Sequence, residues 1–284
     1  MEDILCDNER ESRELKIENR IRTRTSLFYS QLSIFYSLYF LMDGLLRCSR
    51  YAFGPNRLHY CGPDKNREIF SYIAEQEKDA GLVDLLTKFE TMYPYLCHIA
   101  EANKIKDPLS DRVVEAYWIG NPLLDRVPKQ KLYEHLREGL KLKDKLGAKT
   151  FEMIAKKVGR GALPHHSFHV LDIWKRTGAT EREHSLENIS ECLVSVGTIV
   201  SVSGPFITVE TEPLLYRNGK LTLGAPTPKK LLRQLESDYD IEQLKPGDLV
   251  SIHWSVICEK ITRKQAENLR KYTKRHIALA NETI

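Results

Sequence analysis

Residues 191–200 read Glu-Cys-Leu-Val-Ser-Val-Gly-Thr-Ile-Val, and this stretch decides how the second half of the chain folds. From position 197 to 203, and again from 206 to 211, Val and Ile alternate with polar residues. Such alternation is typical of strands with one buried face. The Ser-Gly-Pro that separates the two runs is a turn signal, so the sequence predicts a β-hairpin here.

A second hairpin is predicted a few residues later. Residues 214–216 and 220–223 are short apolar runs, and they flank Asn218-Gly219. Asn-Gly is the strongest short hairpin signal, because both residues tolerate the positive φ that a tight turn needs.

The remaining C-terminal signals predict a helix, a strand and a final helix. Thr227-Pro228 has the form of a helix start, and residues 248–259 read as one strand that carries His253. Residues 262–265 form a capping box that opens the last helix. Four or five strands with these helices are what a small Greek-key or OB-like barrel needs.

The first half of the chain has a different pattern. Over residues 47–175 strand-like alternation is nearly absent, and short apolar stripes at helical spacing are separated by Gly-Pro and Asp-Pro breaks. The predicted fold is therefore α+β. An α-helical domain over 42–185 is followed by a small OB-like β-barrel with a C-terminal helix over 190–280.

The N-terminal residues do not follow this pattern. Residues 1–41 are predicted to be a disordered or non-native extension, because Met42 precedes the first globular patterning. Residues 25–42 carry no charge, but Ser, Thr, Gln, Tyr and Phe dominate them where a spanning helix favours Leu. A membrane anchor is the alternative interpretation of this segment.

Composition restricts the class of protein. With 284 residues and 42% apolar content, the chain has material for one or two domains. A net charge of +4 is too small to indicate nucleic acid by itself. The six cysteines include no C-x-x-C pair, which argues against a zinc ribbon, and a chain of this length needs no disulfide scaffold. Free thiols indicate a cytoplasmic location.

Two motifs resemble a known family. The segment C-L-V-S-V-G-T-I-V, which begins at Cys192, resembles the opening C-x-x-x-P-G-x-V/I-V of the small hydrogenase-assembly chaperones of the HypC/HupF type. The segment L-K-P-G-D-L-V-S-I-H-W-S-V-I-C-E-K-I, which contains His253, resembles a later segment of that family. The resemblance covers about residues 190–275 and implies an OB-like barrel.

The resemblance also implies a function. Members of that family help to deliver iron carrying cyanide and carbonyl ligands to the large subunit of nickel–iron hydrogenases. Cys192 and His253 would hold the iron transiently, while Gly197 and Trp254 would contribute to partner binding. The partner would be a hydrogenase large subunit or another maturation factor, so the expected role is that of a chaperone and not of an enzyme.

Strand geometry gives this site a testable form. Cys192 is expected at the start of the first strand, partly exposed, with its thiolate favoured by a nearby imidazole. If Ile252 and Trp254 fill the barrel, alternation turns His253 outward. The two side chains should then lie within roughly 10 Å of each other, which small adjustments would convert into shared metal coordination.

A second group of candidates lies at the end of the helical half. His165, His166 and His169 fall within five residues, and imidazole is a common ligand of zinc and iron. No H-E-x-x-H motif is present, so a structural role at the domain junction is the simpler interpretation. A metalloenzyme built on these three histidines remains an alternative.

Further blocks of sequence resemble an uncharacterised bacterial and archaeal family, some of whose members are encoded near hydrogenase genes. These blocks are Y-A-F-G-P-N-R-L-H-Y-C-G-P, E-A-Y-W-I-G-N-P-L-L-D-R and P-H-H-S-F-H-V. From them, His59, Cys61 and Asn121 form a second candidate site.

An OB-type nucleic-acid-binding module is the other alternative function. Such a module needs a basic groove with stacking aromatic residues. The predicted strands offer Phe206, Tyr216 and Trp254 but few Lys or Arg, which disfavours nucleic acid as the partner.

Overall fold

The computed structural model describes residues 43–174, 185–233 and 243–284. The predictions for residues 1–41 and 25–42 lie outside these ranges. Up to Trp174 the described chain is helical, with elements α2 (Gly44–Arg57), α3 (Asn66–Glu75), α4 (Ala80–Thr87), α5 (Met92–Ala102), α6 (Asp111–Trp118), η1 (Leu124–Arg126), α7 (Lys129–Glu134), η2 (His135–Gly139), α8 (Leu142–Gly159), α9 (His166–Phe168) and η3 (His169–Ile173). The predicted α-helical character of this half is confirmed.

The strands form one large sheet and one small ribbon. After α10 (Leu186–Cys192) come β1 (Ser195–Ser203), β2 (Phe206–Thr211), β3 (Leu214–Arg217), β4 (Lys220–Leu223), β5 (Thr227–Leu232), β6 (Leu249–His253) and β7 (Val256–Lys260). The five-stranded sheet has the order β5-β2-β1-β6-β7, and β3 pairs only with β4. Its paired neighbours all run antiparallel. Both predicted hairpins, β1–β2 and β3–β4, are confirmed.

Two local predictions were wrong. Residues 227–232 form the strand β5 rather than a helix, because their backbone pairs along the whole of β2. The predicted strand over 248–259 is a hairpin of β6 and β7. Its turn is made by Trp254 and Ser255, whose φ angles are 50° and 60°. Neither residue is the Gly, Asn or Asp that normally marks such a turn, so no local signal predicts it.

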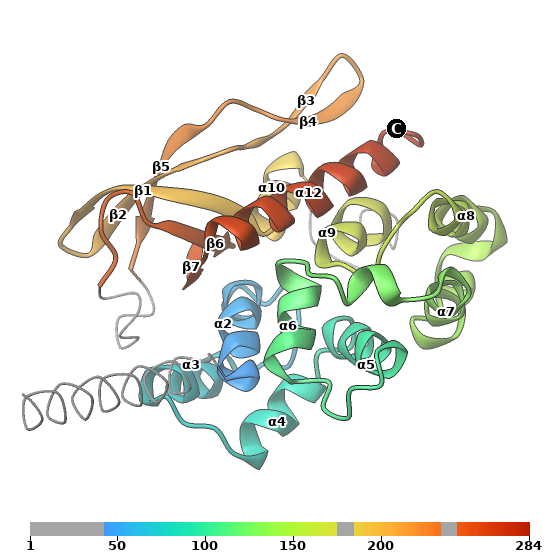
Figure 1. The fold of residues 1–284 in the computed structure, drawn as a ribbon, viewed down its shortest axis with the longest axis horizontal. Coiled ribbons are helices and arrows are strands. Elements are labelled where there is room, and N and C mark those ends of the chain that lie inside the picture. Colours follow the sequence, from blue (N-terminus) through green and yellow to red (C-terminus); the bar gives the residue numbers. More distant parts are fainter. Residues whose placement is uncertain (1–42, 175–184, 234–242) are drawn as a thin grey trace, which may run out of the picture. The chain divides into compact units, whose positions relative to one another are not determined.

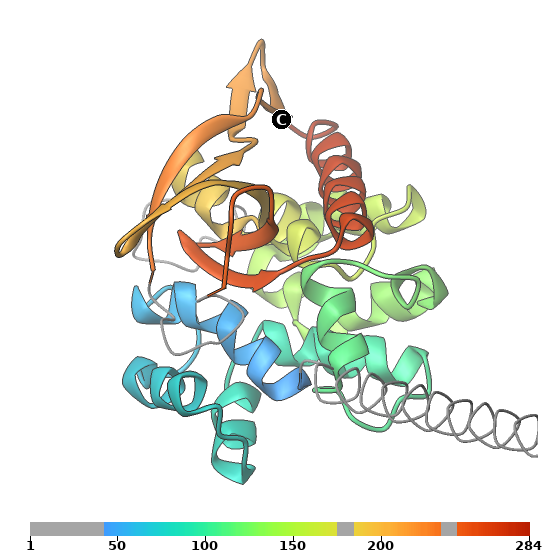
Figure 2. The same cartoon turned by 60° about the vertical axis from the view of Figure 1, so that its left-hand side comes forward.

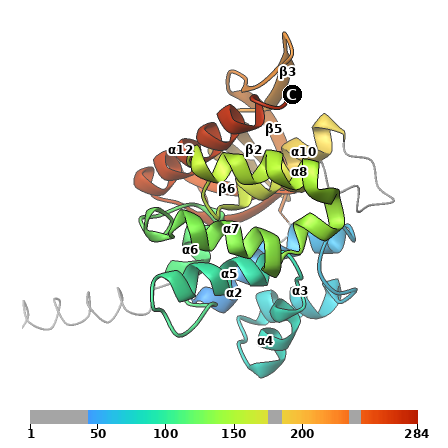
Figure 3. The ribbon, with the colours of Figure 1, turned by 90° about the vertical axis from the view of Figure 1, so that its right-hand side faces the viewer.

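The C-terminal helix α12 (Arg263–Ala280) closes the fold. Its capping box is present as predicted: the Thr262 hydroxyl accepts from the Gln265 backbone, and the Gln265 side chain accepts from the Thr262 backbone. The buried face of α12 is lined by Ala266, Leu269, Tyr272, His276 and Ile277, among others. Figures 1 and 3 show α12 packed between the strands and the helices of the first half.

Residues 43–284 form one compact unit. A single buried cluster includes side chains from the helices, such as Tyr51 and Leu96, and from the strands, such as Val209 and Ile252. The helix α2 lies at this junction, where it packs against β6 and β7 (Figure 2). The fold is thus α+β, with N-terminal helices, then a sheet, then a C-terminal helix. In the described part of the chain the sheet ends at β5 and β7, and no pairing joins them.

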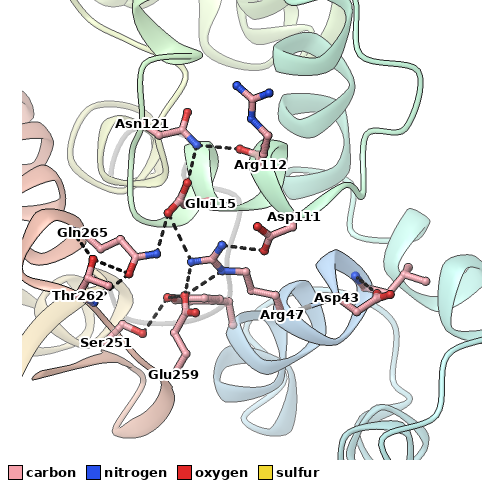
Figure 4. A network of polar contacts seen from close by, with 12 residues as sticks. Asp43, Arg47, Asp111, Arg112, Glu115, Asn121, Ser251, Glu259, Thr262 and Gln265 are labelled. Carbon is pink, nitrogen blue, oxygen red and sulfur yellow. Dashed lines mark hydrogen bonds and ion pairs between the residues drawn. The ribbon is translucent and has the colours of Figure 1, made fainter. Parts of the chain in front are cut away.

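A buried polar network ties α2 to the sheet (Figure 4). The Arg47 guanidinium lies 2.8 Å from Glu259 Oε1 of β7 and 2.8 Å from Asp111 Oδ1 of α6. The Tyr51 hydroxyl donates to Glu259 Oε1 at 2.6 Å, and it also lies 2.7 Å from Ser251 Oγ. Because Arg47 and Glu259 are both buried, this network fixes how the helices meet the strands.

Among the helices of the described ranges, none is long and apolar enough to cross a membrane.

Candidate metal site

Three side chains that can ligate a metal converge where the helices meet the sheet. His166 is the first residue of α9, Cys192 is the last of α10, and His253 is the last of β6. One ligand atom from each lies within 4.8 Å of the other two. His166 Nε2 is 4.0 Å from Cys192 Sγ. Both histidines are buried, while Cys192 is only partly buried.

Backbone contacts bring Cys192 to His253. The amide of Trp254 donates to the Glu191 carbonyl at 2.9 Å, so the β6–β7 turn is bonded to the end of α10. The Ser255 hydroxyl donates to Glu191 Oε2 at 2.7 Å and strengthens the same junction. These contacts place the residues after Glu191 and before Trp254, namely Cys192 and His253, side by side.

The hydrogen bond of His253 prepares it as a ligand. Its Nδ1 lies 2.7 Å from the Tyr51 carbonyl oxygen. A carbonyl can only accept, so Nδ1 carries the proton and Nε2 keeps its lone pair. This Nε2 is buried and has no hydrogen-bond partner among the described residues. A metal-ligating histidine usually donates its other ring N–H to such a carbonyl or carboxylate.

His166 has a partner on each side of its ring. Its Nε2 lies 2.8 Å from the Cys192 carbonyl, and its Nδ1 lies 3.2 Å from the Tyr117 hydroxyl. In this state Nε2 carries the proton, because the carbonyl must accept. Coordination through Nε2 would require the proton to move to Nδ1, where the Tyr117 oxygen can accept it.

Burial sets the protonation of all three groups. It lowers the pKa of His253 to about 4, an effect that the nearby carbonyls of Tyr51 and Cys192 partly offset. It lowers the pKa of His166 well below the usual range, and His253 adds to that shift. Burial also raises the pKa of the Cys192 thiol, with a further rise from Cys61. The imidazoles are therefore neutral at pH 7 and the thiol is protonated.

Aromatic rings form the walls. The Trp118 ring lies 4.5 Å from that of His166 and 5.2 Å from that of His253, measured between ring centroids. The Tyr51 ring stacks on Trp118 at 5.1 Å. These rings leave the histidines little rotational freedom, so the donor atoms are held in place before any ligand arrives.

The donor set defines the chemistry. Two imidazoles and one thiolate suit borderline and soft transition metals such as Zn²⁺, Fe²⁺ and copper. Three protein donors leave a coordination position for an exogenous ligand, as in catalytic zinc sites. Because Cys192 is the least buried donor, that position is most accessible on its side.

The sequence-based predictions for this pair were right in proximity and wrong in detail. Cys192 and His253 do lie together. Cys192 ends a helix, however, and does not begin a strand. His253 is 1% exposed and does not face outward, because β6 is covered on both sides. Burial also raises the thiol pKa, so the expected thiolate is not favoured in the metal-free protein.

The three histidines that are clustered in the sequence have different surroundings in the structure. Only His166 reaches Cys192 and His253. His165 caps α9, and its Nδ1 lies 2.8 Å from Ser167 Oγ. Its ring stacks against the rings of Tyr272 and His276 on α12. The His169 ring lies 5.8 Å from that of Tyr95. The geometry therefore does not assemble these histidines around one metal.

The other predicted residues do not belong to the group of three donors. Gly197 and Trp254 are buried, so neither offers a surface to a partner. His59 is exposed and pairs with Asp64 at 3.1 Å, and Cys61 is also exposed. Asn121 is buried and donates to the Arg112 carbonyl and to Glu115 (Figure 4).

Sequence reasoning missed the grouping of His166 with Cys192 and His253. It also missed Tyr51, Tyr117 and Trp118, which orient and enclose the donors. His166 and Cys192, which are in contact, are 26 residues apart in the sequence. His253 and Tyr51 are 202 residues apart. No periodicity or motif carries information over such separations.

Gly54 permits the close approach of α2 to this site. A Cβ at this position would lie 2.7 Å from the His253 carbonyl oxygen and 3.1 Å from Trp254 Cβ. We expect Gly54→Ala to lower the free energy of unfolding by about 1–3 kcal/mol, since backbone must shift to relieve the overlap. Urea unfolding measures the change.

Gly159→Ala is the matched control, because Gly159 is also helical and its added Cβ would meet nothing within 4 Å. This control should be neutral or stabilising by up to about 1 kcal/mol. Equal effects of the two substitutions would contradict the packing described for Gly54.

Comparison with known proteins gave one result. No curated protein and no solved structure matches the chain. A family model described as "Family of unknown function (DUF6390)" matches residues 41–284, which include the whole of the compact unit and all three donors. The chain therefore belongs to the DUF6390 family.

Proposed function

We propose that this protein binds one transition-metal ion through His166, Cys192 and His253, and that it is an accessory protein of metal-centre assembly. The proposal is carried by the convergence of one ligand atom from each of two imidazoles and a thiol within 4.8 Å, together with the buried Nε2 of His253, which has no hydrogen-bond partner among the described residues. Leaving such an atom without a partner costs about 1–3 kcal/mol. A bound metal would supply the missing partner.

The resemblance to HypC/HupF-type chaperones supports a more specific role. It suggests iron with cyanide and carbonyl ligands as transient cargo, and a hydrogenase large subunit or another maturation factor as the partner. It also suggests that residues 190–280 are an OB-like barrel and that the protein works in the cytoplasm, where thiols stay reduced. The open position on the Cys192 side favours a cargo over a permanently closed structural ion.

Metal reconstitution tests the donor set. We expect metal-free protein to bind one equivalent of Co²⁺ or Fe²⁺ under anaerobic conditions, with a thiolate-to-cobalt charge-transfer band in the near ultraviolet. Cys192→Ser should remove this band, and His253→Ala should weaken binding by at least about tenfold. Because burial raises the thiol pKa, metal must displace its proton, so binding should strengthen as pH rises.

Cys97→Ser is the matched control. Cys97 is also partly buried and burial raises its thiol pKa, but it does not belong to the His166, Cys192 and His253 group. This variant should bind cobalt as the parent does. A charge-transfer band that survives Cys192→Ser would show that the metal sits elsewhere.

Infrared spectroscopy separates metal binding from the assembly role. Protein purified anaerobically from cells that make nickel–iron hydrogenase should show cyanide and carbonyl stretching bands that Cys192→Ser abolishes. Stoichiometric metal without these bands would leave the site intact and refute iron cargo.

A further inference from the structure

A cavity of about 260 Å³ lies beside the metal site, between α10, the ends of β1 and β2, the β3–β4 ribbon, β5 and α12. None of its lining residues is one of the three metal donors. Its apolar wall consists of Leu193, Val194, Val196, Leu214 and Leu269, among others.

Two ion pairs line the cavity. Lys229 of β5 pairs with Glu191 of α10, and Arg270 of α12 pairs with Glu212 at 2.7 Å. The four charges sum to zero. An anionic ligand would meet two carboxylates and a cationic ligand would meet two cations, so the lining favours a molecule that carries both signs.

Two threonine hydroxyls give an independent indication of a ligand. Thr211 and Thr273 both line the cavity and are 8% and 5% exposed. Neither Oγ1 has a hydrogen-bond partner among the described residues. Valine has the same shape but no hydroxyl that requires a hydrogen-bond partner. A buried hydroxyl without such a partner lowers stability by about 1–3 kcal/mol. A ligand that bonds these hydroxyls would recover that cost.

We propose that this cavity binds a small zwitterion of the α-amino-acid class with an aliphatic side chain. The ligand carboxylate would bind at the basic members of the two ion pairs and accept from a threonine hydroxyl. The ligand ammonium would bind at Glu191 or Glu212, and the side chain would pack on the leucine and valine wall. The proposal does not rest on metal binding.

Isothermal titration of the full-length protein with L-leucine tests the proposal. EDTA is included so that leucine cannot act by binding a metal. We expect one leucine to bind per chain. N-acetyl-L-leucine lacks the ammonium and L-leucinamide lacks the carboxylate, and each should bind at least about tenfold more weakly. Equal affinity for all three compounds, or no leucine binding at millimolar concentration, would overturn the proposal.

Substitutions at the hydroxyls locate the site. Thr211→Val and Thr273→Val should each weaken leucine binding at least about tenfold. Neither should lower the melting temperature of the ligand-free protein, because each removes an unsatisfied polar group. Thr222→Val is the control, since this exposed threonine does not line the cavity. Unchanged leucine affinity in both cavity variants would contradict the assignment.

Discussion

We expect Arg47→Met to lower the free energy of unfolding by about 3–5 kcal/mol, the range for breaking a buried ion pair from one side. The substitution keeps an unbranched apolar stem but removes the cation that pairs with the buried Glu259 and leaves only the charge of Arg50 to offset the carboxylate. Burial raises the pKa of Glu259, and Arg47 opposes that rise. Without Arg47, the carboxyl must take up a proton or the junction between α2 and β7 must open. Urea unfolding at pH 7 measures the loss.

A second substitution separates this charge effect from simple loss of packing. Adding Glu259→Gln to Arg47→Met removes the stranded carboxylate, so the double variant should be more stable than Arg47→Met alone. Lys88→Met is the surface control: Lys88 and Asp84 form an exposed pair at 2.6 Å, and its loss should change stability by about 0.5 kcal/mol or less. The changes in free energy of unfolding caused by Arg47→Met alone and by Glu259→Gln alone are compared with that of the double variant. If the two single effects add up to the double effect, the two charges are not energetically coupled.

Local chemistry explains which parts of the fold the sequence predicts. The Asn218-Gly219 turn and the capping box at Thr262 act within a few residues, and the structure contains both. The Thr227-Pro228 signal is equally local, yet these residues pair with β2. There the backbone bonds of a neighbouring strand outweigh the preference of an isolated helix start.

Local sequence signals predict the candidate site only in part, for the same reason. The resemblance to known chaperones predicts that Cys192 and His253 meet, and it gives no reason to add His166. Alternation predicts that His253 faces outward, but this argument assumes that one face of β6 meets solvent. The helix α2 covers that face, and the Tyr51 carbonyl of α2 accepts a hydrogen bond from His253 Nδ1. Packing between distant segments decides how deeply the site is buried, and sequence periodicity carries no information about that packing.

A second group of histidines should also make the stability depend on pH. The rings of His98 and His135 stack at 4.7 Å, and those of His135 and His169 lie 4.7 and 5.8 Å from the Tyr95 ring. Burial lowers the pKa of His98, His135 and His169 to about 4, 3 and 4. His98 and His169 add to the shift of His135. All three are therefore neutral in the folded protein at pH 7.

The sign of the pH dependence follows from these shifts. In the unfolded chain a histidine takes up a proton near pH 6.5. The folded state resists protonation until about pH 4, so the unfolded state binds more protons between these values. The stabilisation is complete above pH 6.5 and is lost as the pH falls toward 4. Each such histidine costs up to roughly 1.4 kcal/mol per pH unit in this window.

We therefore expect the free energy of unfolding to fall steeply between pH 6.5 and 5, as measured by urea unfolding at half-unit intervals. His135→Phe keeps an aromatic ring between His98 and Tyr95 but removes one titrating group, so it should make the slope shallower. Tyr95→Phe removes only a hydroxyl and should leave the slope unchanged. Glu101 and Glu134 favour protonation of His98, whereas Lys131 opposes it, so their sum helps to set the pH at which the folded protein protonates His98 and its contribution to the fall ends. A stability that stays constant from pH 7 to 5 would show that these imidazoles accept protons where they lie in the folded protein.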